Sequence, residues 1–131
     1  MELAKAAGAK RALPLAVSAP FHCTLMTPAA EAMAKALAET DIAAPCVPLV
    51  ANVTAGPLTD PAAIRDSLVK QVTGTVRWRE SVAYMAGQGV TRFVEVGAGK
   101  VLAGLVKRIA AGASALSVGT PADVEAFKAG R

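Results

Sequence analysis

The alternation of short apolar runs with longer segments of helical periodicity constrains the fold of this chain more than any other feature. Apolar side chains recur at helical spacing, as at Ile64, Leu68 and Val72, and proline or glycine marks most segment ends. We expect strands over 13–18, 47–53, 92–96 and 115–118, and helices over 27–40, 61–73, 78–86, 101–109 and from 121 onward. Because helices connect most of these strands, the pattern predicts an α/β fold with a mainly parallel sheet and flanking helices.

Local signals place several helix ends. Gly8 follows a short helical stretch and is typical of a helix C-terminus. Thr27 before Pro28 predicts an N-cap followed by proline in the first turn, and Asp60 before a proline predicts the same. Residues 120–123, Thr-Pro-Ala-Asp, resemble a capping box.

The composition fits one folded domain, or a piece of a larger one. Of 131 residues, 53% are hydrophobic and the formal net charge is +4. A basic surface can attract polyanions, but no run of five basic residues exists, so we expect no nucleic-acid partner. We expect no membrane partner either, because no apolar run is long enough to span a bilayer and the N-terminus lacks a signal peptide's apolar stretch.

The two cysteines, Cys23 and Cys46, do not form a metal-binding pattern with the single histidine. We interpret both as reduced structural residues of a cytoplasmic protein, with no metal and no cofactor.

His22 is the first candidate for chemistry. It follows the predicted strand over 13–18, and sites in open α/β sheets gather beyond the carboxyl ends of strands. Imidazole is well suited to accept a hydroxyl proton near neutral pH. The alternative interpretation is a histidine that merely satisfies its hydrogen bonds within a turn.

No partner nucleophile is evident. The serine elbow Gly-x-Ser-x-Gly is absent, and the nearest approach, at Ser114, lacks the second glycine and precedes a strand. Cys23 adjoins His22, but neighbouring side chains on a turn usually diverge.

A glycine-rich loop over 97–100, Gly-Ala-Gly-Lys, joins a predicted strand to a helix. Free N–H groups at a helix start can hold an anion, so Lys100 and this loop could bind phosphate. The loop lacks a complete nucleotide-binding fingerprint, and a tight turn is the alternative. Glu95 lies in the preceding strand, where we expect it to pair with a basic group.

Several segments, taken together, resemble the bacterial malonyl-CoA:acyl-carrier-protein transacylases of type II fatty acid synthesis. The two most specific are Pro-Phe-His-Cys at 20–23 and Glu-Val-Gly-Ala-Gly-Lys-Val-Leu at 95–102. The other matching segments, in the family's order, are 10–19, 50–53, 64–71, 76–78, 84–85 and 93–94.

The resemblance implies a two-step transfer. A serine takes malonyl from malonyl-CoA and passes it to the phosphopantetheine thiol of the acyl carrier protein, with His22 as general base. Gln71 matches the position whose main-chain carbonyl orients the histidine, although by itself it reads as a polar residue at a helix end. Phe21 matches a pocket position where a bulky ring disfavours a methyl branch on the acyl group; a core anchor under the turn is the alternative.

The family's serine elbow and its carboxylate-binding arginine lie upstream of the matched segments. The resemblance therefore implies that residues 1–11 are the tail of a small ferredoxin-like subdomain, or its return linker. It implies that residues 12–131 are the C-terminal part of an α/β-hydrolase-like acyltransferase core. We expect the chain to be inactive alone and to need the missing N-terminal half of the same enzyme. The alternative function is a non-catalytic module that docks the acyl carrier protein.

Overall fold

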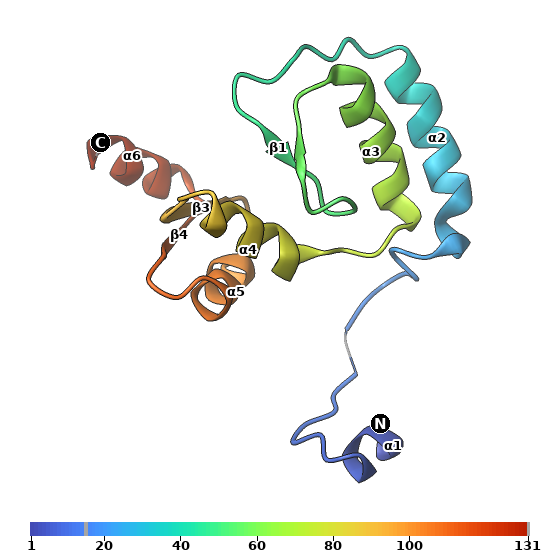
Figure 1. The fold of residues 1–131 in the computed structure, drawn as a ribbon, viewed down its shortest axis with the longest axis vertical. Helices are drawn as coiled ribbons and strands as arrows, with labels where there is room; N and C mark the ends of the chain where they lie inside the picture. Colours follow the sequence, from blue (N-terminus) through green and yellow to red (C-terminus); the bar gives the residue numbers. More distant parts are fainter. Residues whose placement is uncertain (15, 131) are drawn as a thin grey trace.

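The computed structural model describes residues 1–14 and 16–130 (Figure 1). Its helices and strands, in chain order, are α1 Glu2–Ala6, η1 Thr24–Met26, α2 Thr27–Ala38, β1 Leu49–Val50, β2 Pro57–Leu58, α3 Pro61–Thr73, α4 Trp78–Gly87, β3 Arg92–Val96, α5 Val101–Ile109, β4 Ser114–Val118 and α6 Pro121–Ala129. Helices α2 and α3 lie side by side with the β1–β2 hairpin, while α4, α5 and α6 surround the β3–β4 pair (Figure 1).

Strands β3 and β4 confirm the expected parallel pairing. Their register runs from Arg92 opposite Ser114 to Val96 opposite Val118, and α5 makes the crossover between them. A helical crossover is the connection that parallel neighbours require, because a tight turn cannot return the chain to the same end of the sheet.

The prediction of a mainly parallel sheet is correct only for the pair β3 and β4. The described residues form two two-stranded sheets, and the other one, β1 with β2, is antiparallel. The strand predicted over 47–53 shortens to Leu49–Val50. Pro48 and Pro57 have no N–H group, so the ladder cannot extend past them as a regular pair of strands would.

The strand predicted over 13–18 does not form among the described residues of that segment; Leu15 lies outside them. Leu13 and Val17 are 67% and 66% exposed. The described residues of this segment belong to no helix or strand and lie between α1 and η1 (Figure 1). A strand persists when a neighbouring strand satisfies its N–H and C=O groups, and no described segment pairs with this one.

The best-buried core lies between α4, α5 and the β3–β4 pair. Val82, Val106 and Ala110 are 0%, 2% and 6% exposed. Trp78 and Phe93 pack around them, half-buried. Val82 in α4 and Val106 in α5 therefore mark the faces of these two helices that turn toward the core.

The helix starts follow the sequence with one exception. Asp60 accepts a hydrogen bond from Ala63 N at 3.0 Å, and Thr120 forms the expected capping box with Asp123. The predicted cap at Thr27 is wrong, because α2 already includes Thr27 and its hydroxyl donates to Thr24 O at 2.6 Å. The 3-10 turn η1 leads directly into α2, so no separate cap is needed there.

None of the helices in the described part of the chain is long and apolar enough to cross a membrane.

The carboxyl ends of β3 and β4 approach each other closely at two glycines. A Cβ atom on Gly119 would lie 2.7 Å from Gly97 O, and Gly97 itself has φ of 135°. A backbone oxygen cannot move aside as a flexible side chain would, so only glycine fits at position 119 without displacing the loop.

We expect Gly119→Ala to lower the free energy of unfolding by roughly 1–3 kcal/mol, because the added methyl group overpacks this backbone contact. Chemical denaturation followed by circular dichroism measures the change. Gly104→Ala is the matched control: position 104 is an exposed site within α5 where a Cβ meets nothing within 4 Å. That variant should be stabilised by about 0.5–1 kcal/mol. Equal stability for Gly119→Ala and the unsubstituted chain would contradict the close approach.

Candidate functional site

His22 lies in a short irregular segment immediately before η1, with an exposed ring. Its φ is 59°, in the left-handed region that residues with a Cβ atom rarely adopt. Cys23 Sγ, on the next residue, donates to Pro20 O at 3.1 Å and closes the turn on itself. The sequence carried no signal of this backbone conformation, which aims the ring toward α3.

The ring is held by a main-chain group. His22 Nδ1 lies 3.0 Å from Gln71 O, a contact between residues 49 positions apart. A carbonyl oxygen can only accept, so Nδ1 must carry the proton and donate it. In the neutral ring this leaves Nε2 with its lone pair, and an exposed basic nitrogen is what a general base requires.

Gln71 offers a free carbonyl because of its position in α3. The N–H that would complete the helical pattern belongs to Thr75, beyond the end of the helix at Thr73. Gly74, with ψ of 157°, turns the chain away and leaves the carbonyl accessible. The interaction thus uses an acceptor that every helix C-terminus must satisfy in some way.

The loop over 51–55 packs against this end of α3. Asn52 Nδ2 donates to Gln71 Oε1 at 3.4 Å, a long hydrogen bond. Val53 Cγ2 lies 2.9 Å from the place where a Cβ atom on Gly74 would stand, so the missing side chain permits the contact. Apart from its place in a matching segment, Asn52 was not singled out by the sequence, because polar loop residues are common.

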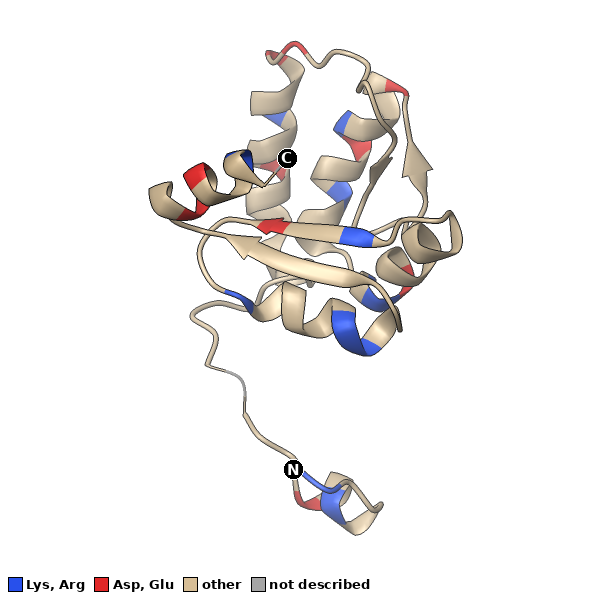
Figure 2. Cartoon of the chain, turned by 90° about the vertical axis from the view of Figure 1, so that its left-hand side faces the viewer, with Lys and Arg blue, Asp and Glu red and all other residues tan. Residues whose placement is uncertain are grey.

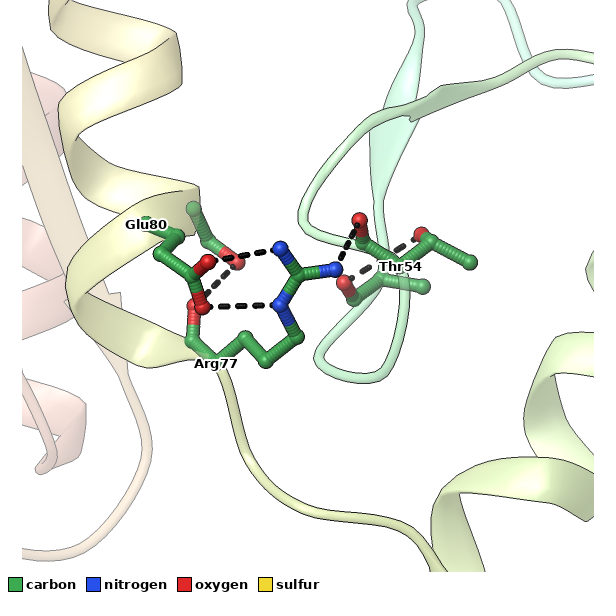
Figure 3. A network of polar contacts seen from close by, with 5 residues as sticks. Thr54, Arg77 and Glu80 are labelled. Carbon is green, nitrogen blue, oxygen red and sulfur yellow. Dashed lines mark hydrogen bonds and ion pairs between the residues drawn. The ribbon is translucent and has the colours of Figure 1, made fainter.

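Arg77 connects the same loop to the start of α4 (Figure 3). Its Nη1 donates to Thr54 O at 3.0 Å, and its main-chain N donates to Asn52 O at 2.9 Å. Its Nε and Nη2 donate to the two Glu80 carboxylate oxygens at 2.7 and 2.6 Å. The hydrogen bonds from Arg77 lower the pKa of Glu80 below its usual value.

Phe21 is 54% exposed, so it is not a core anchor under the turn. It directly precedes His22 in the chain. Its role in the acyl pocket remains a prediction.

The candidate nucleophiles within the chain do not gain support. Ser114 lies in β4, and its hydroxyl donates to Thr91 O at 3.3 Å.

Among the residues that the structure describes, no three His, Cys, Asp or Glu side chains gather into a possible metal site.

The glycine-rich loop over 97–100 is a poor anion site, because a carboxylate already occupies the start of α5. Glu95 accepts hydrogen bonds from Leu102 N at 3.1 Å, Ala103 N at 2.9 Å and Ser117 Oγ at 3.0 Å. The N–H groups of Leu102 and Ala103 are helix groups that would hold a phosphate, and the negative charge beside them repels one. The expectation that Glu95 pairs with a basic group is therefore wrong.

Comparison with known proteins identifies the chain. No protein-family model matches it. It is 53% identical over 122 residues to the malonyl CoA-acyl carrier protein transacylase of Salmonella typhimurium, a match that covers 93% of the chain. With the Bacillus subtilis enzyme of the same name it shares 45% over 124 residues. The chain belongs to the malonyl CoA-acyl carrier protein transacylase family.

Solved structures agree with this membership. The acyl-carrier-protein-S-malonyltransferase of Bartonella henselae superposes with a TM-score of 0.85 at 52% identity, over 96% of the chain. A malonyl-transacylase in complex with its type II PKS acyl-carrier protein gives 0.86 at 44% identity, over 99% of the chain. The chain spans about 40% of the length of the Salmonella transacylase and 42% of the complexed one.

The chain should become less stable in acid, because the carboxylate of Glu95 loses its charge there. The N–H of Ala103, foremost among its hydrogen-bond donors, lowers the pKa of this carboxyl below its ordinary value of 4.5, against partial desolvation. A lowered folded-state pKa means that the carboxylate contributes stability above the unfolded-state pKa, and that this contribution disappears as pH falls through the folded-state pKa. We expect Glu95→Gln to lower the unfolding midpoint at pH 7, and the deficit to shrink below about pH 4.5.

Thermal unfolding of both proteins between pH 7 and pH 3 measures this deficit. Glu31→Gln, at an exposed position on α2, is the charge-matched control and should follow the unsubstituted chain throughout. A deficit for Glu95→Gln that stays constant across this range would show that the charge of Glu95 does not stabilise α5.

Proposed function

We propose that this chain supplies the histidine-bearing part of a transacylase that moves malonyl from CoA to the acyl carrier protein. The observation that carries the proposal is the hydrogen bond from His22 Nδ1 to Gln71 O, at 3.0 Å. It fixes the tautomer in which Nε2 is free to accept a proton. Family membership supplies the reaction, and this bond supplies a physical reason for His22 to act as its base.

In the first half-reaction, Nε2 of His22 accepts the proton of a serine hydroxyl as the serine oxygen attacks the thioester carbonyl of malonyl-CoA. The tetrahedral intermediate collapses, the bond from carbon to sulfur breaks, and the CoA sulfur takes the proton from the imidazolium. In the second half-reaction, the phosphopantetheine thiol loses its proton to Nε2 and attacks the serine ester. The serine oxygen then leaves with that proton, so the histidine returns to its starting state.

The Gln71 carbonyl does the orienting work that an aspartate does in a Ser-His-Asp triad. It lies at the C-terminal end of α3, where the helix dipole is negative. The dipole therefore faces the positive charge that develops on the ring during proton transfer. No buried carboxylate has to be desolvated beside the ring for this purpose.

The serine and the group that binds the malonyl carboxylate would come from the part of the transacylase that the chain does not match. We infer that residues 12–131 belong to the acyltransferase core and residues 1–11 to the small subdomain or its return linker. The chain alone should then bind no malonyl covalently.

The acyl carrier protein is the proposed protein partner. A transacylase 44% identical to this chain has been solved in complex with an acyl-carrier protein. The formal charge of +4 suits an acidic partner, although the basic residues are spread over several elements in Figure 2. Docking without catalysis remains the second candidate, and the experiment below separates the two.

We expect His22→Ala to lower malonyl transfer by roughly 10²–10⁴-fold when the chain is combined with the unmatched part of a relative such as the Salmonella transacylase. Transfer of labelled malonyl from malonyl-CoA to holo-acyl carrier protein measures the rate. Cys23→Ser, at the adjacent position, should keep transfer within a few-fold of the reconstituted enzyme.

Unchanged transfer in His22→Ala, or loss only in Cys23→Ser, would overturn the assignment of the base. Carrier-protein binding without any transfer in the reconstituted enzyme would favour the docking module.

Phe21 sets a separate expectation for substrate choice. If its ring narrows the acyl pocket, Phe21→Ala should reduce the preference for malonyl-CoA over methylmalonyl-CoA by about 1–3 kcal/mol, or roughly 10–200-fold in relative kcat/KM. Competition between the two thioesters in the reconstituted enzyme measures the ratio. An unchanged ratio would remove Phe21 from the pocket.

A further inference from the structure

We propose that Asn52 and Arg77 are positioning residues for His22, because together they hold the loop over 51–55 against the helix end that binds the imidazole. The catalytic consequence rests on the proposed function. The effect on the histidine ring does not, so the two can fail separately.

Among the described residues, few polar contacts fix the ring of His22. His22 is exposed, its backbone is in the left-handed region, and the polar contact of its side chain is with Gln71 O. The position of that carbonyl therefore determines where Nε2 points. Gln71 is close to the C-terminus of α3, where helices fray because the last carbonyls lack helical partners.

The loop over 51–55 contacts this helix end through two neighbouring residues. Asn52 Nδ2 reaches Gln71 Oε1 at 3.4 Å, and Val53 packs over Gly74. The loop is also compact in itself, since Ala55 N donates to Ala51 O at 2.9 Å and Ala55 has φ of 52°. A shift of this loop would therefore reach Gln71 in two ways: through the side-chain amide of Asn52 and through the contact between Val53 and Gly74.

Arg77 secures the loop from the opposite side (Figure 3). Its main-chain N and its Nη1 donate to the carbonyls of Asn52 and Thr54, so one residue satisfies two main-chain acceptors of a loop that belongs to no helix. The guanidinium uses separate nitrogens for its two partners: Nη1 donates to Thr54 O, while Nε and Nη2 donate to Glu80. A lysine could not make the paired and the single contact at once.

A purely structural role for Arg77 predicts a different pattern. Exposed ion pairs contribute little to global stability, so the Arg77–Glu80 pair alone should matter little to the fold or to the ring. The hydrogen bond to Thr54 O is the component that connects Arg77 to the histidine. Variants that separate the two contacts distinguish the roles.

The chain has a single histidine, so its ring nitrogens give an unambiguous long-range proton–nitrogen NMR signature of the tautomer. In the unsubstituted chain we expect the Nδ1–H form. Asn52→Ala and Arg77→Gln should each shift the spectrum toward a mixture of the two tautomers. The backbone amide spectrum, recorded on the same samples, shows whether each variant is folded.

Two controls isolate the Thr54 contact. Glu80→Gln weakens the ion pair but leaves the donor to Thr54 O, and should keep the Nδ1–H signature. Arg79→Gln removes the same charge from an exposed position two residues further along the chain and should also leave the signature unchanged. If Arg77→Gln unfolds the chain, Arg77→Lys tests the same contact with the positive charge retained, and an intermediate shift is expected.

An unchanged histidine signature in folded Asn52→Ala and folded Arg77→Gln or Arg77→Lys would overturn the proposal. So would an equal shift in Glu80→Gln and Arg77→Gln, because the ion pair alone would then be responsible. In the reconstituted transacylase, the positioning variants should lower kcat by up to roughly 100-fold with little change in KM. A different outcome is that the variants shift the histidine signature while the reconstituted enzyme without substitutions transfers no malonyl. That outcome would sustain the positioning role and count against the proposed function.

Discussion

The hydrogen bond between the His22 ring and the Gln71 carbonyl is the interaction on which the functional part of this structure depends. It joins an irregular segment near the N-terminus to the end of α3, at 3.0 Å, and no regular element carries the histidine itself. The carbonyl fixes the tautomer because it can only accept. The chemistry proposed for the chain follows from this single geometric constraint.

The C-terminus of α3 and the N-terminus of α5 serve opposite electrostatic roles. At the C-terminus of α3, a free carbonyl accepts a proton donor and faces developing positive charge. At the N-terminus of α5, free N–H groups receive the Glu95 carboxylate, which fills a loop that otherwise resembles a phosphate cradle. Both cases follow from the unsatisfied backbone groups that every helix leaves at its ends. These unsatisfied groups explain why the C-terminus of α3 binds the ring of the candidate base, whereas the N-terminus of α5 is closed to anions.

The differences from the expected sheet have a common cause. Strand formation needs a partner for each N–H and C=O group, and the local sequence does not show whether one is present. Residues 92–96 and 114–118 find each other through α5, whereas the described residues of 13–18 remain exposed and unpaired with any described strand. The side chains of that segment are apolar enough for a strand, so only the surrounding structure distinguishes the two outcomes.

The sequence by itself determined the helical segments, the caps at Asp60 and Thr120, and the choice of His22 as the chemical residue. These depend on neighbours a few positions apart or on side-chain type. Only the tertiary structure decided the left-handed turn at His22, the absence of a strand among the described residues of 13–18, the capping of α5 by Glu95, and the Arg77 contact with the loop at Asn52. The physical reason is distance along the chain, because hydrogen bonds between residues brought together by folding leave no periodic trace in the sequence.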